Sequence, residues 1–244
     1  MEDFVIRSKR SPDFAFEKKY WERGFPWVIG VDEVGRGALA GPVVAGAAFY
    51  RIQNSEIRIQ EEVLRLGIDD SKRLTPKKRE ELEKIIPEYF YTGIGEASVV
   101  EINDVGIVVA TEKAMRRAIQ EIKILRNKEI KEKIASIPNV SISQFLNFFL
   151  LIDGNRRIRG IRKLLQQAII AGDQKSISIA AASIVAKVYR DRLMKQLSKD
   201  FDRYGWDHNV GYGTASHIDA LIKYGVTILH REVFVDFLQL SSRI

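Results

Sequence analysis

The chain has 244 residues, 45% of them hydrophobic, and 39 lysines and arginines against 32 acids give a formal net charge of +7. This composition allows one large or two modest domains with a buried core and excludes disorder for most of the chain. Because there is no cysteine, only three histidines and no HExxH pattern, any metal site has to use oxygen ligands, which favour Mg²⁺, Mn²⁺ or Ca²⁺.

The N-terminal segment is charged throughout and lacks the apolar stretch of a secretory signal. No apolar run approaches the roughly 20 residues that a membrane-spanning helix needs. We therefore expect a soluble, cytoplasmic protein with no membrane contact. Its basic charge favours a polyanionic partner, although a modest net charge is weak evidence for nucleic acid.

The predicted elements alternate between strands and helices along the chain. After Thr75, a typical N-cap, Pro76 occupies the first helical position and marks one helix start. Strands interleaved with helices predict an α/β fold. In chain order we predict an irregular or helical lead-in over 1–26, strands at 28–31 and 43–50, a polar connection with a short helix over 51–75, a helix over 76–86, a strand over 90–98, a helix from 101 with a charged tail to 133, strands over 148–153 and 164–171, and helices over 176–199, 214–223 and 232–242.

Four carboxylates stand at the ends of apolar, strand-like runs. Several partly desolvated like charges at one sheet edge are costly unless a cation holds them, so the pattern predicts a Mg²⁺ or Mn²⁺ site for phosphoryl chemistry. A single aspartate after a strand is more often a turn former or a helix N-cap, and the pattern alone leaves both interpretations open. The residues are Asp32 and Glu33 after VIGV, Asp153 after FFLLI and Asp173 after AIIAG.

Gly35, Arg36 and Gly37 follow the first pair of acids. Such a glycine pair most often marks a tight turn, and no helix follows directly, so this is not a dinucleotide fingerprint. Alternatively, the missing Cβ atoms let the backbone approach a ligand closely while Arg36 donates to a phosphate.

Basic and aromatic residues allow similar pairs of interpretations. Residues 155–163 contain five basic side chains and no acid, which is typical of a solvated face but also suits phosphate contact beside Asp153. We expect Tyr204 and Trp206 to pack in the interior. Tyr212, in the same glycine-rich loop, is a candidate for stacking on a sugar or base.

The segment over residues 30–49, GVDEVGRGALAGPVVAGAAF, resembles ribonuclease HII, a type 2 ribonuclease H family. Further blocks follow in the family's order and span nearly the whole chain from residue 28. They are DDSKRLTPKKRE (69–80), ATEKAMRRA (110–118), LLIDG (150–154), GDQKSISIAAASIVAKVYRDRLM (172–194), GYGT with a later histidine (211–217) and HREVF (230–234).

This resemblance implies a fold and an activity. The expected fold is α/β, an RNase H-like mixed sheet flanked by helices, with the lead-in over 1–26, the catalytic domain over 27–200 and a helical part over 201–244 packed on it. The expected enzyme is a monomeric endoribonuclease that hydrolyses the RNA strand of RNA–DNA hybrids. It would cut 5′ of a ribonucleotide at RNA–DNA junctions, including single ribonucleotides in duplex DNA, with two Mg²⁺ or Mn²⁺ ions.

The resemblance also implies roles for individual residues. Gly35, Arg36 and Gly37 match the motif that reads the 2′-hydroxyl through backbone groups, and Tyr212 matches a tyrosine that stacks on the following deoxyribose. Asp191 matches a structural helix acid. The implied metal ligands are Asp32, Glu33, Asp153 and Asp173, and the implied phosphate contacts are Lys72, Ser183 and Lys187.

The chain departs from the family pattern in a few places. Gly106 stands where the family commonly has asparagine, and Val210 where it has lysine. Val233 and Asp236 replace a serine and a proline, and 123–146 is expected to be a longer connection than usual. Two other functions stay open as alternatives: a non-catalytic hybrid-binding protein of the same fold, and a metal phosphatase acting on small phosphoesters, which leaves the GRG turn without a role.

Overall fold

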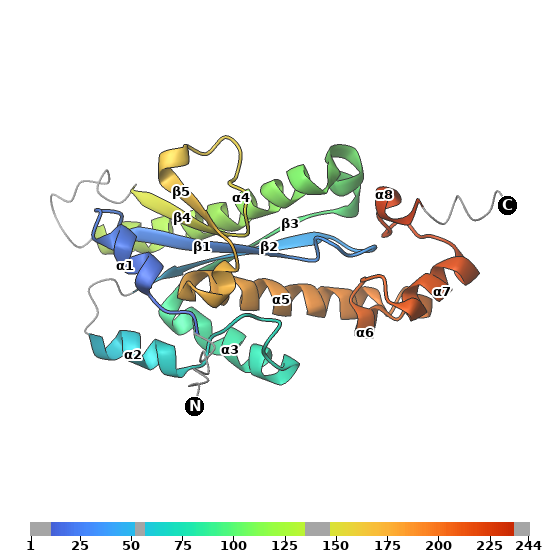
Figure 1. Ribbon diagram of the computed structural model, residues 1–244, viewed down its shortest axis with the longest axis horizontal. Coiled ribbons are helices and arrows are strands. Elements are labelled where there is room, and N and C mark those ends of the chain that lie inside the picture. Colours follow the sequence, from blue (N-terminus) through green and yellow to red (C-terminus); the bar gives the residue numbers. More distant parts are fainter. Residues whose placement is uncertain (1–10, 52–56, 135–146, 237–244) are drawn as a thin grey trace, which may run out of the picture.

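The computed structural model describes residues 11–51, 57–134 and 147–236. Within them one mixed sheet lies between helices (Figure 1). The helices are α1 (Ala15–Trp21), α2 (Ile57–Arg65), α3 (Pro76–Tyr89), α4 (Val99–Ile134), α5 (Ile177–Leu197), α6 (Trp206–Asn209), α7 (Ala215–Tyr224) and α8 (Glu232–Val235), and the strands are β1 (Trp27–Val34), β2 (Val43–Tyr50), β3 (Phe90–Ala97), β4 (Phe148–Asp153) and β5 (Gln166–Ile169).

The five strands are ordered β3-β2-β1-β4-β5. Strands β1, β2 and β3 pair antiparallel, whereas β1, β4 and β5 pair parallel. In the parallel pair Val31 lies opposite Ile152, so the acids that follow them reach the same edge of the sheet. This mixed α/β architecture is the fold class predicted from the sequence.

Helix α4 covers one face of the sheet, and α5 covers the other with α3 beside it (Figure 1). Small residues bring both long helices close to the strands. A Cβ on Gly30 of β1 would lie 2.2 Å from the carbonyl carbon of Ser178, and one on Gly46 of β2 would lie 2.2 Å from the carbonyl oxygen of Ala182. Because no larger residue fits, α5 packs almost backbone to backbone on the two central strands.

Most predicted elements are confirmed, with changes at their ends. Thr75 caps α3 by accepting a hydrogen bond from the Lys78 backbone N–H. The strand predicted over 164–171 is too long: β5 is shorter, a 3-10 turn precedes it, and Ala171 turns the chain with a φ of 52°. The loop predicted before residue 214 contains the short helix α6.

Gly106 interrupts α4 with a φ of 76° and a ψ of 158°, a backbone conformation that only glycine adopts without strain. The departure from the family's asparagine therefore coincides with a kink. Beyond it α4 continues to Ile134, so the first part of the connection predicted over 123–146 is helical and 135–146 lies outside the described residues.

The C-terminal part forms its own small core next to the end of α5. Tyr204 and Trp206 are buried there, as predicted. Of the helix predicted over 232–242, the first residues form α8, which ends at Val235, and residues 237–242 lie outside the described residues. Division of the chain at about residues 26 and 200 remains a prediction. None of the helices in the described ranges is long and apolar enough to cross a bilayer.

Candidate active site

Three of the four predicted acids come together at the carboxyl edge of the sheet. Asp32 ends the apolar part of β1, Asp153 ends β4, and Asp173 lies in the 3-10 turn between β5 and α5. A carboxylate oxygen from each lies within 4.8 Å of the others. The Gly172 backbone N–H donates to the Asp153 carboxylate over 2.6 Å, which ties the turn to the end of β4.

Glu33 lies beside this group but not within it. Consecutive residues of a strand point to opposite faces, so Asp32 and Glu33 cannot share one. Asp32 lies with Ser183 of α5 in one hollow, whereas Glu33 also lines a second hollow with Thr111 of α4. The acids therefore straddle the sheet edge.

The negative charges of the three aspartates repel one another. Burial, reinforced by Asp153 and Glu33, raises the pKa of Asp32 well above its ordinary value. Burial and then Asp153 raise the pKa of Asp173 to about 6. Oxygen ligands whose negative charges are held apart from water, at this spacing, fit a divalent cation such as Mg²⁺ or Mn²⁺. The residues therefore suit the metal site predicted from the sequence.

The hollow on the α5 side brings Tyr212 and the predicted phosphate contacts to the acids. Burial alone would lower the pKa of Lys72, but four nearby aspartates, with Asp32 and Asp173 contributing most, outweigh it and raise that pKa. Lys187 also lines the hollow, where its ammonium lies 2.7 Å from Asp191. The lining residues are Asp32, Glu33, Val34, Ser71, Lys72, Ser183, Lys187 and Tyr212.

Asp191 binds basic side chains instead of joining the acidic group. Besides Lys187, it lies 3.7 Å from Arg79 of α3. These ion pairs occupy its carboxylate, and the structural role implied by the resemblance stays a prediction.

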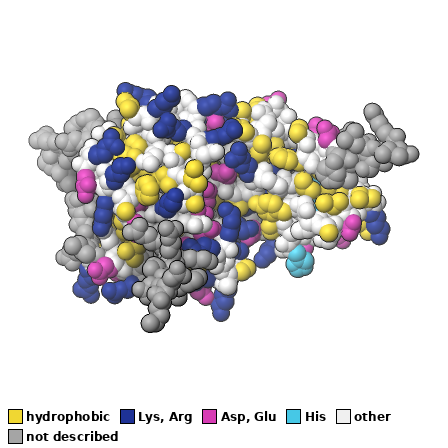
Figure 2. Space-filling view, in the orientation of Figure 1, with side chains coloured by type: hydrophobic (Ala, Val, Ile, Leu, Met, Phe, Trp, Pro, Cys, Tyr) yellow, Lys and Arg dark blue, Asp and Glu magenta, His cyan; other side chains and the backbone are white. Residues whose placement is uncertain are grey.

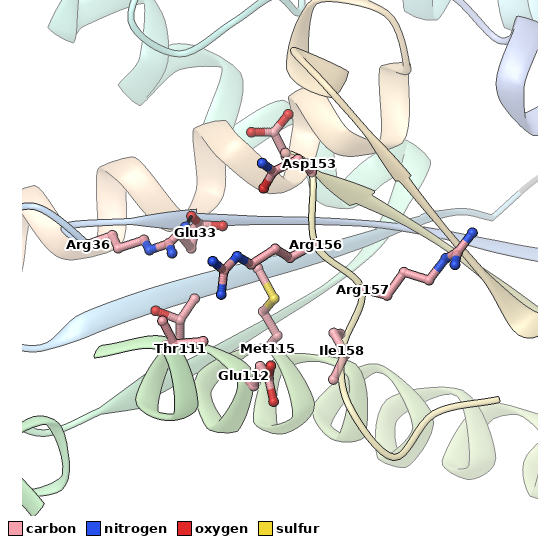
Figure 3. A pocket seen from close by; sticks show the side chains of 12 residues that line it. Glu33, Arg36, Thr111, Glu112, Met115, Asp153, Arg156, Arg157 and Ile158 are labelled. Carbon is pink, nitrogen blue, oxygen red and sulfur yellow. Dashed lines mark hydrogen bonds and ion pairs between the residues drawn. The ribbon is translucent and has the colours of Figure 1, made fainter. Parts of the chain in front are cut away.

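The hollow on the α4 side is lined by part of the basic segment after β4. Figure 3 shows Arg156 pointing toward Glu33 and Arg36, while Arg157 points away from them. The Arg159 side chain forms an ion pair with Glu112 of α4, with 2.9 Å between Nε and Oε1. In Figure 2, acidic side chains near the middle of the view have lysines and arginines on both sides. Of the arginines at 156, 157 and 159, Arg156 is therefore the one that points toward the acids.

The GRG segment forms the turn that follows β1. Gly35 has a φ of 82°, and a Cβ on Gly37 would meet no atom within 4 Å, so its backbone is open to a ligand. The Arg36 side chain lies 3.4 Å from Glu33 and is 44% exposed. Arg36 and Gly37 are therefore exposed, whereas Gly35 is buried against the fold.

Asp70 was not predicted from the sequence. It is 5% exposed, accepts hydrogen bonds from the Lys72 backbone N–H and the Gln174 side chain, and raises the pKa of Asp173. Ser71, which follows Asp70 in the chain, accepts a hydrogen bond from Ser183 over 2.9 Å. Asp70, Ser71 and Lys72 all lie in the block DDSK, so this block was the sequence signal that could have identified Asp70 and Ser71.

An acidic cluster at the edge of a mixed α/β sheet, in a groove lined with lysine and arginine, defines a metal-dependent nuclease. The family model described as Ribonuclease HII matches residues 29–237, and the chain belongs to that family. Its members act as ribonucleases H, so the protein hydrolyses RNA in RNA–DNA hybrids and uses divalent metal.

Relatives and solved structures agree with this assignment. Ribonuclease HII of Anaplasma phagocytophilum is 40% identical over 91% of this chain and 92% of its own length, and that of Pelagibacter ubique is 42% identical over 85% and 95%. The fold resembles ribonuclease H2 from Pyrococcus horikoshii OT3, with a TM-score of 0.58, 22% identity, and coverage of 89% of this chain and 99% of that one. It also resembles Bst-RNase HIII in complex with Mn²⁺, with a TM-score of 0.50, 20% identity, and coverage of 85% and 64%.

Proposed function

We propose that the enzyme cuts 5′ of a ribonucleotide at RNA–DNA junctions, including a single ribonucleotide in duplex DNA. The observation that carries the proposal is that one groove joins Asp32 and Glu33 to Tyr212, while the GRG turn, open at Gly37, directly follows the strand that contains these two acids. A single ribonucleotide differs from its neighbours by one 2′-hydroxyl, and backbone donors and acceptors beside the scissile bond are suited to read it.

Asp32, Glu33, Asp153 and Asp173 would hold two ions, Mg²⁺ or Mn²⁺. The oxygen-only donor set and the mutual repulsion of the aspartates support this assignment. When bound, such ions would activate the attacking water and neutralise the charge that develops on the departing 3′ oxygen. The fold's likeness to an RNase HIII that binds Mn²⁺ is consistent with it.

The other predicted residues would bind and orient the substrate. Tyr212 would stack on the deoxyribose that follows the ribonucleotide. Lys72 and Lys187 would approach phosphates from the α5 side of the groove, and Ser183 would donate a hydrogen bond there. We take the active protein to be a monomer, which light scattering of the purified chain would test.

The proposal is tested with a DNA duplex that contains one ribonucleotide, in parallel reactions that contain Mg²⁺, Mn²⁺ or EDTA. We expect metal-dependent cleavage 5′ of the ribonucleotide and none of the matched all-DNA duplex. Equal cleavage of the all-DNA duplex would contradict the reading of the 2′-hydroxyl.

Two variants separate cleavage from binding. Asp32→Asn should abolish cleavage while duplex binding persists, since the basic surface is untouched. Tyr212→Ala should raise KM for the single-ribonucleotide duplex more than it lowers kcat. A wild-type protein that binds the hybrid without cutting it at any metal concentration would favour the alternative, a non-catalytic hybrid-binding protein.

A further inference from the structure

Two arginines lie buried behind the GRG turn. Arg190 of α5 and Arg231, which precedes α8, are each 0% exposed. Burial lowers the pKa of both; that of Arg231, which Arg190 lowers further, falls to about 9. Burying two neighbouring guanidinium groups costs free energy that apolar residues would not, so their placement requires an explanation beyond packing.

Within the described residues, every side-chain hydrogen bond of these two arginines goes to a backbone carbonyl. Arg190 donates to the carbonyls of Pro42 over 3.0 Å, Ala40 over 3.2 Å and Val210 over 2.9 Å. Arg190 thus joins two segments that are far apart in the sequence, the stretch after the GRG turn and the loop that carries Tyr212.

Arg231 holds the other side of the same turn. It donates to the carbonyl of Gly41 and to the carbonyl of Arg36, both over 3.0 Å. The second bond fixes a peptide group inside the GRG turn itself. A guanidinium suits this task because its N–H groups point in fixed directions, whereas a lysine ammonium is a single point charge.

Arg190 also contacts both proposed substrate-reading elements directly. A Cβ on Gly35 would lie 2.0 Å from the Nε atom of Arg190, so the guanidinium rests against the glycine. On its other side, the guanidinium carbon lies 5.6 Å from the centroid of the Tyr212 ring. One buried side chain therefore spans the turn and the tyrosine.

Backbone hydrogen bonds complete this unit. The N–H groups of Leu39 and Ala40 both donate to the carbonyl of Gly211, over 2.8 and 3.2 Å. The Arg231 N–H in turn donates to the Leu39 carbonyl over 2.8 Å. The turn, the 210–213 loop and the segment before α8 consequently share one hydrogen-bonded framework.

We propose that Arg190 and Arg231 are positioning residues that hold the GRG turn and Tyr212 in a single arrangement and thereby set the preference for a ribonucleotide. The inference rests on the proposed function of those two elements. The hydrogen bonds of both arginines go to this framework and not to the aspartate cluster, so they act on substrate recognition and leave metal binding unchanged.

The test uses the metal-loaded enzyme and the variants Arg190→Lys and Arg231→Lys. The preference is the ratio of Ki for an all-DNA duplex, as competitive inhibitor, to KM for the same duplex with one ribonucleotide. We expect each variant to lower this ratio about tenfold, equivalent to one lost hydrogen bond to the 2′-hydroxyl. The change should arise in KM, with the Mn²⁺ concentration for half-maximal rate unaltered.

Arg192→Lys is the matched control. Arg192 lies on the same helix and also uses its guanidinium fork, but it is exposed and binds the half-buried Glu83 of α3, so the ratio should stay at the wild-type value. A folded Arg190→Lys enzyme with a ratio within about twofold of wild type would overturn the inference. If Arg190→Lys does not fold, a ratio within about twofold of wild type in a folded Arg231→Lys enzyme would overturn the inference.

Failure of the proposed function is recognised separately. A wild-type enzyme that cuts an RNA–DNA hybrid but not the single-ribonucleotide duplex would refute the proposed cleavage site. In that case KM is measured with the hybrid as substrate, and an unchanged ratio in both lysine variants would still refute the positioning role.

Discussion

Replacing Asp32 by asparagine should stabilise the metal-free protein while it abolishes cleavage. Asp32 is 5% exposed, and burial together with Asp153 and Glu33 raises its pKa well above 3.8. Every unit of that elevation costs the folded state about 1.4 kcal/mol at a pH above both pKa values. An amide of the same shape removes this cost and keeps an oxygen that can accept the Glu33 N–H, which donates to Asp32 over 2.7 Å.

We therefore expect a rise in Tm, at about 2–4 °C for each kcal/mol gained by a chain of this size. The assay is thermal unfolding by circular dichroism in EDTA, at pH 8 and at pH 5. Because the folded-state pKa is raised, the penalty is absent below pH 3.8 and grows as the pH rises toward the folded-state value. The stability advantage of the variant should therefore be larger at pH 8 than at pH 5.

Adding Mn²⁺ should reverse the order of the two proteins. Ligand binding to the folded state at 100 times Kd contributes about 2.7 kcal/mol, and the variant has lost one of the ligands. Asp219→Asn, at an exposed position of α7, is the matched control and should leave Tm unchanged under every condition. If Asp32→Asn melts below wild type in EDTA at pH 8, the aspartates do not repel one another as argued, and the case for a cation site loses its electrostatic support.

Three further substitutions test the packing around the site. Gly30→Ala should cost about 3 kcal/mol, since the new Cβ meets the Ser178 backbone, and it should also lower kcat by displacing β1 from α5; urea unfolding and steady-state cleavage measure the two effects. Gly106→Asn should cost about 1–3 kcal/mol because of the glycine-only backbone at the kink, with kcat retained, and a stable variant would contradict that conformation. His217→Phe should destabilise the protein by about 2 kcal/mol, because the Tyr212 carbonyl loses the His217 Nδ1–H, 2.9 Å away, and the Trp206 Nε1–H loses its acceptor. The variant should also raise KM, and an unchanged KM in a folded variant would show that the bond to His217 does not hold Tyr212 in place.

The strands and the acidic edge were predictable from sequence because both follow from local pattern. Apolar runs that end in an acid indicate a strand and its carboxyl end together, as at Asp32 and Asp153. How the acids divide between the two faces depends on the strand register: Asp32 and Glu33 follow one another on β1, and Glu33 lines both hollows. Its predicted role as a metal ligand stays a prediction.

Other parts of the site depend on long-range contacts that local patterns do not contain. Asp70 lies in a loop and reaches Asp173 only through the tertiary fold. Arg190 occupies a helix position where an arginine usually faces solvent, yet it is fully buried. The hydrogen bonds that explain it come from segments around Ala40 and Val210, which no periodicity connects.

The close approach of α5 to β1 has an evolutionary consequence. Gly30 lies two residues before Asp32, and Ser178 lies shortly after Asp173, so the contact between glycine and helix backbone joins the two chain segments that carry these aspartates. A mutation that adds even one methyl group at this contact would push apart the two segments that carry these acids. We therefore expect drift in this lineage to accumulate in the outer surfaces of α3 and α7, while selection for cleavage keeps the glycine and alanine content of this interface nearly fixed.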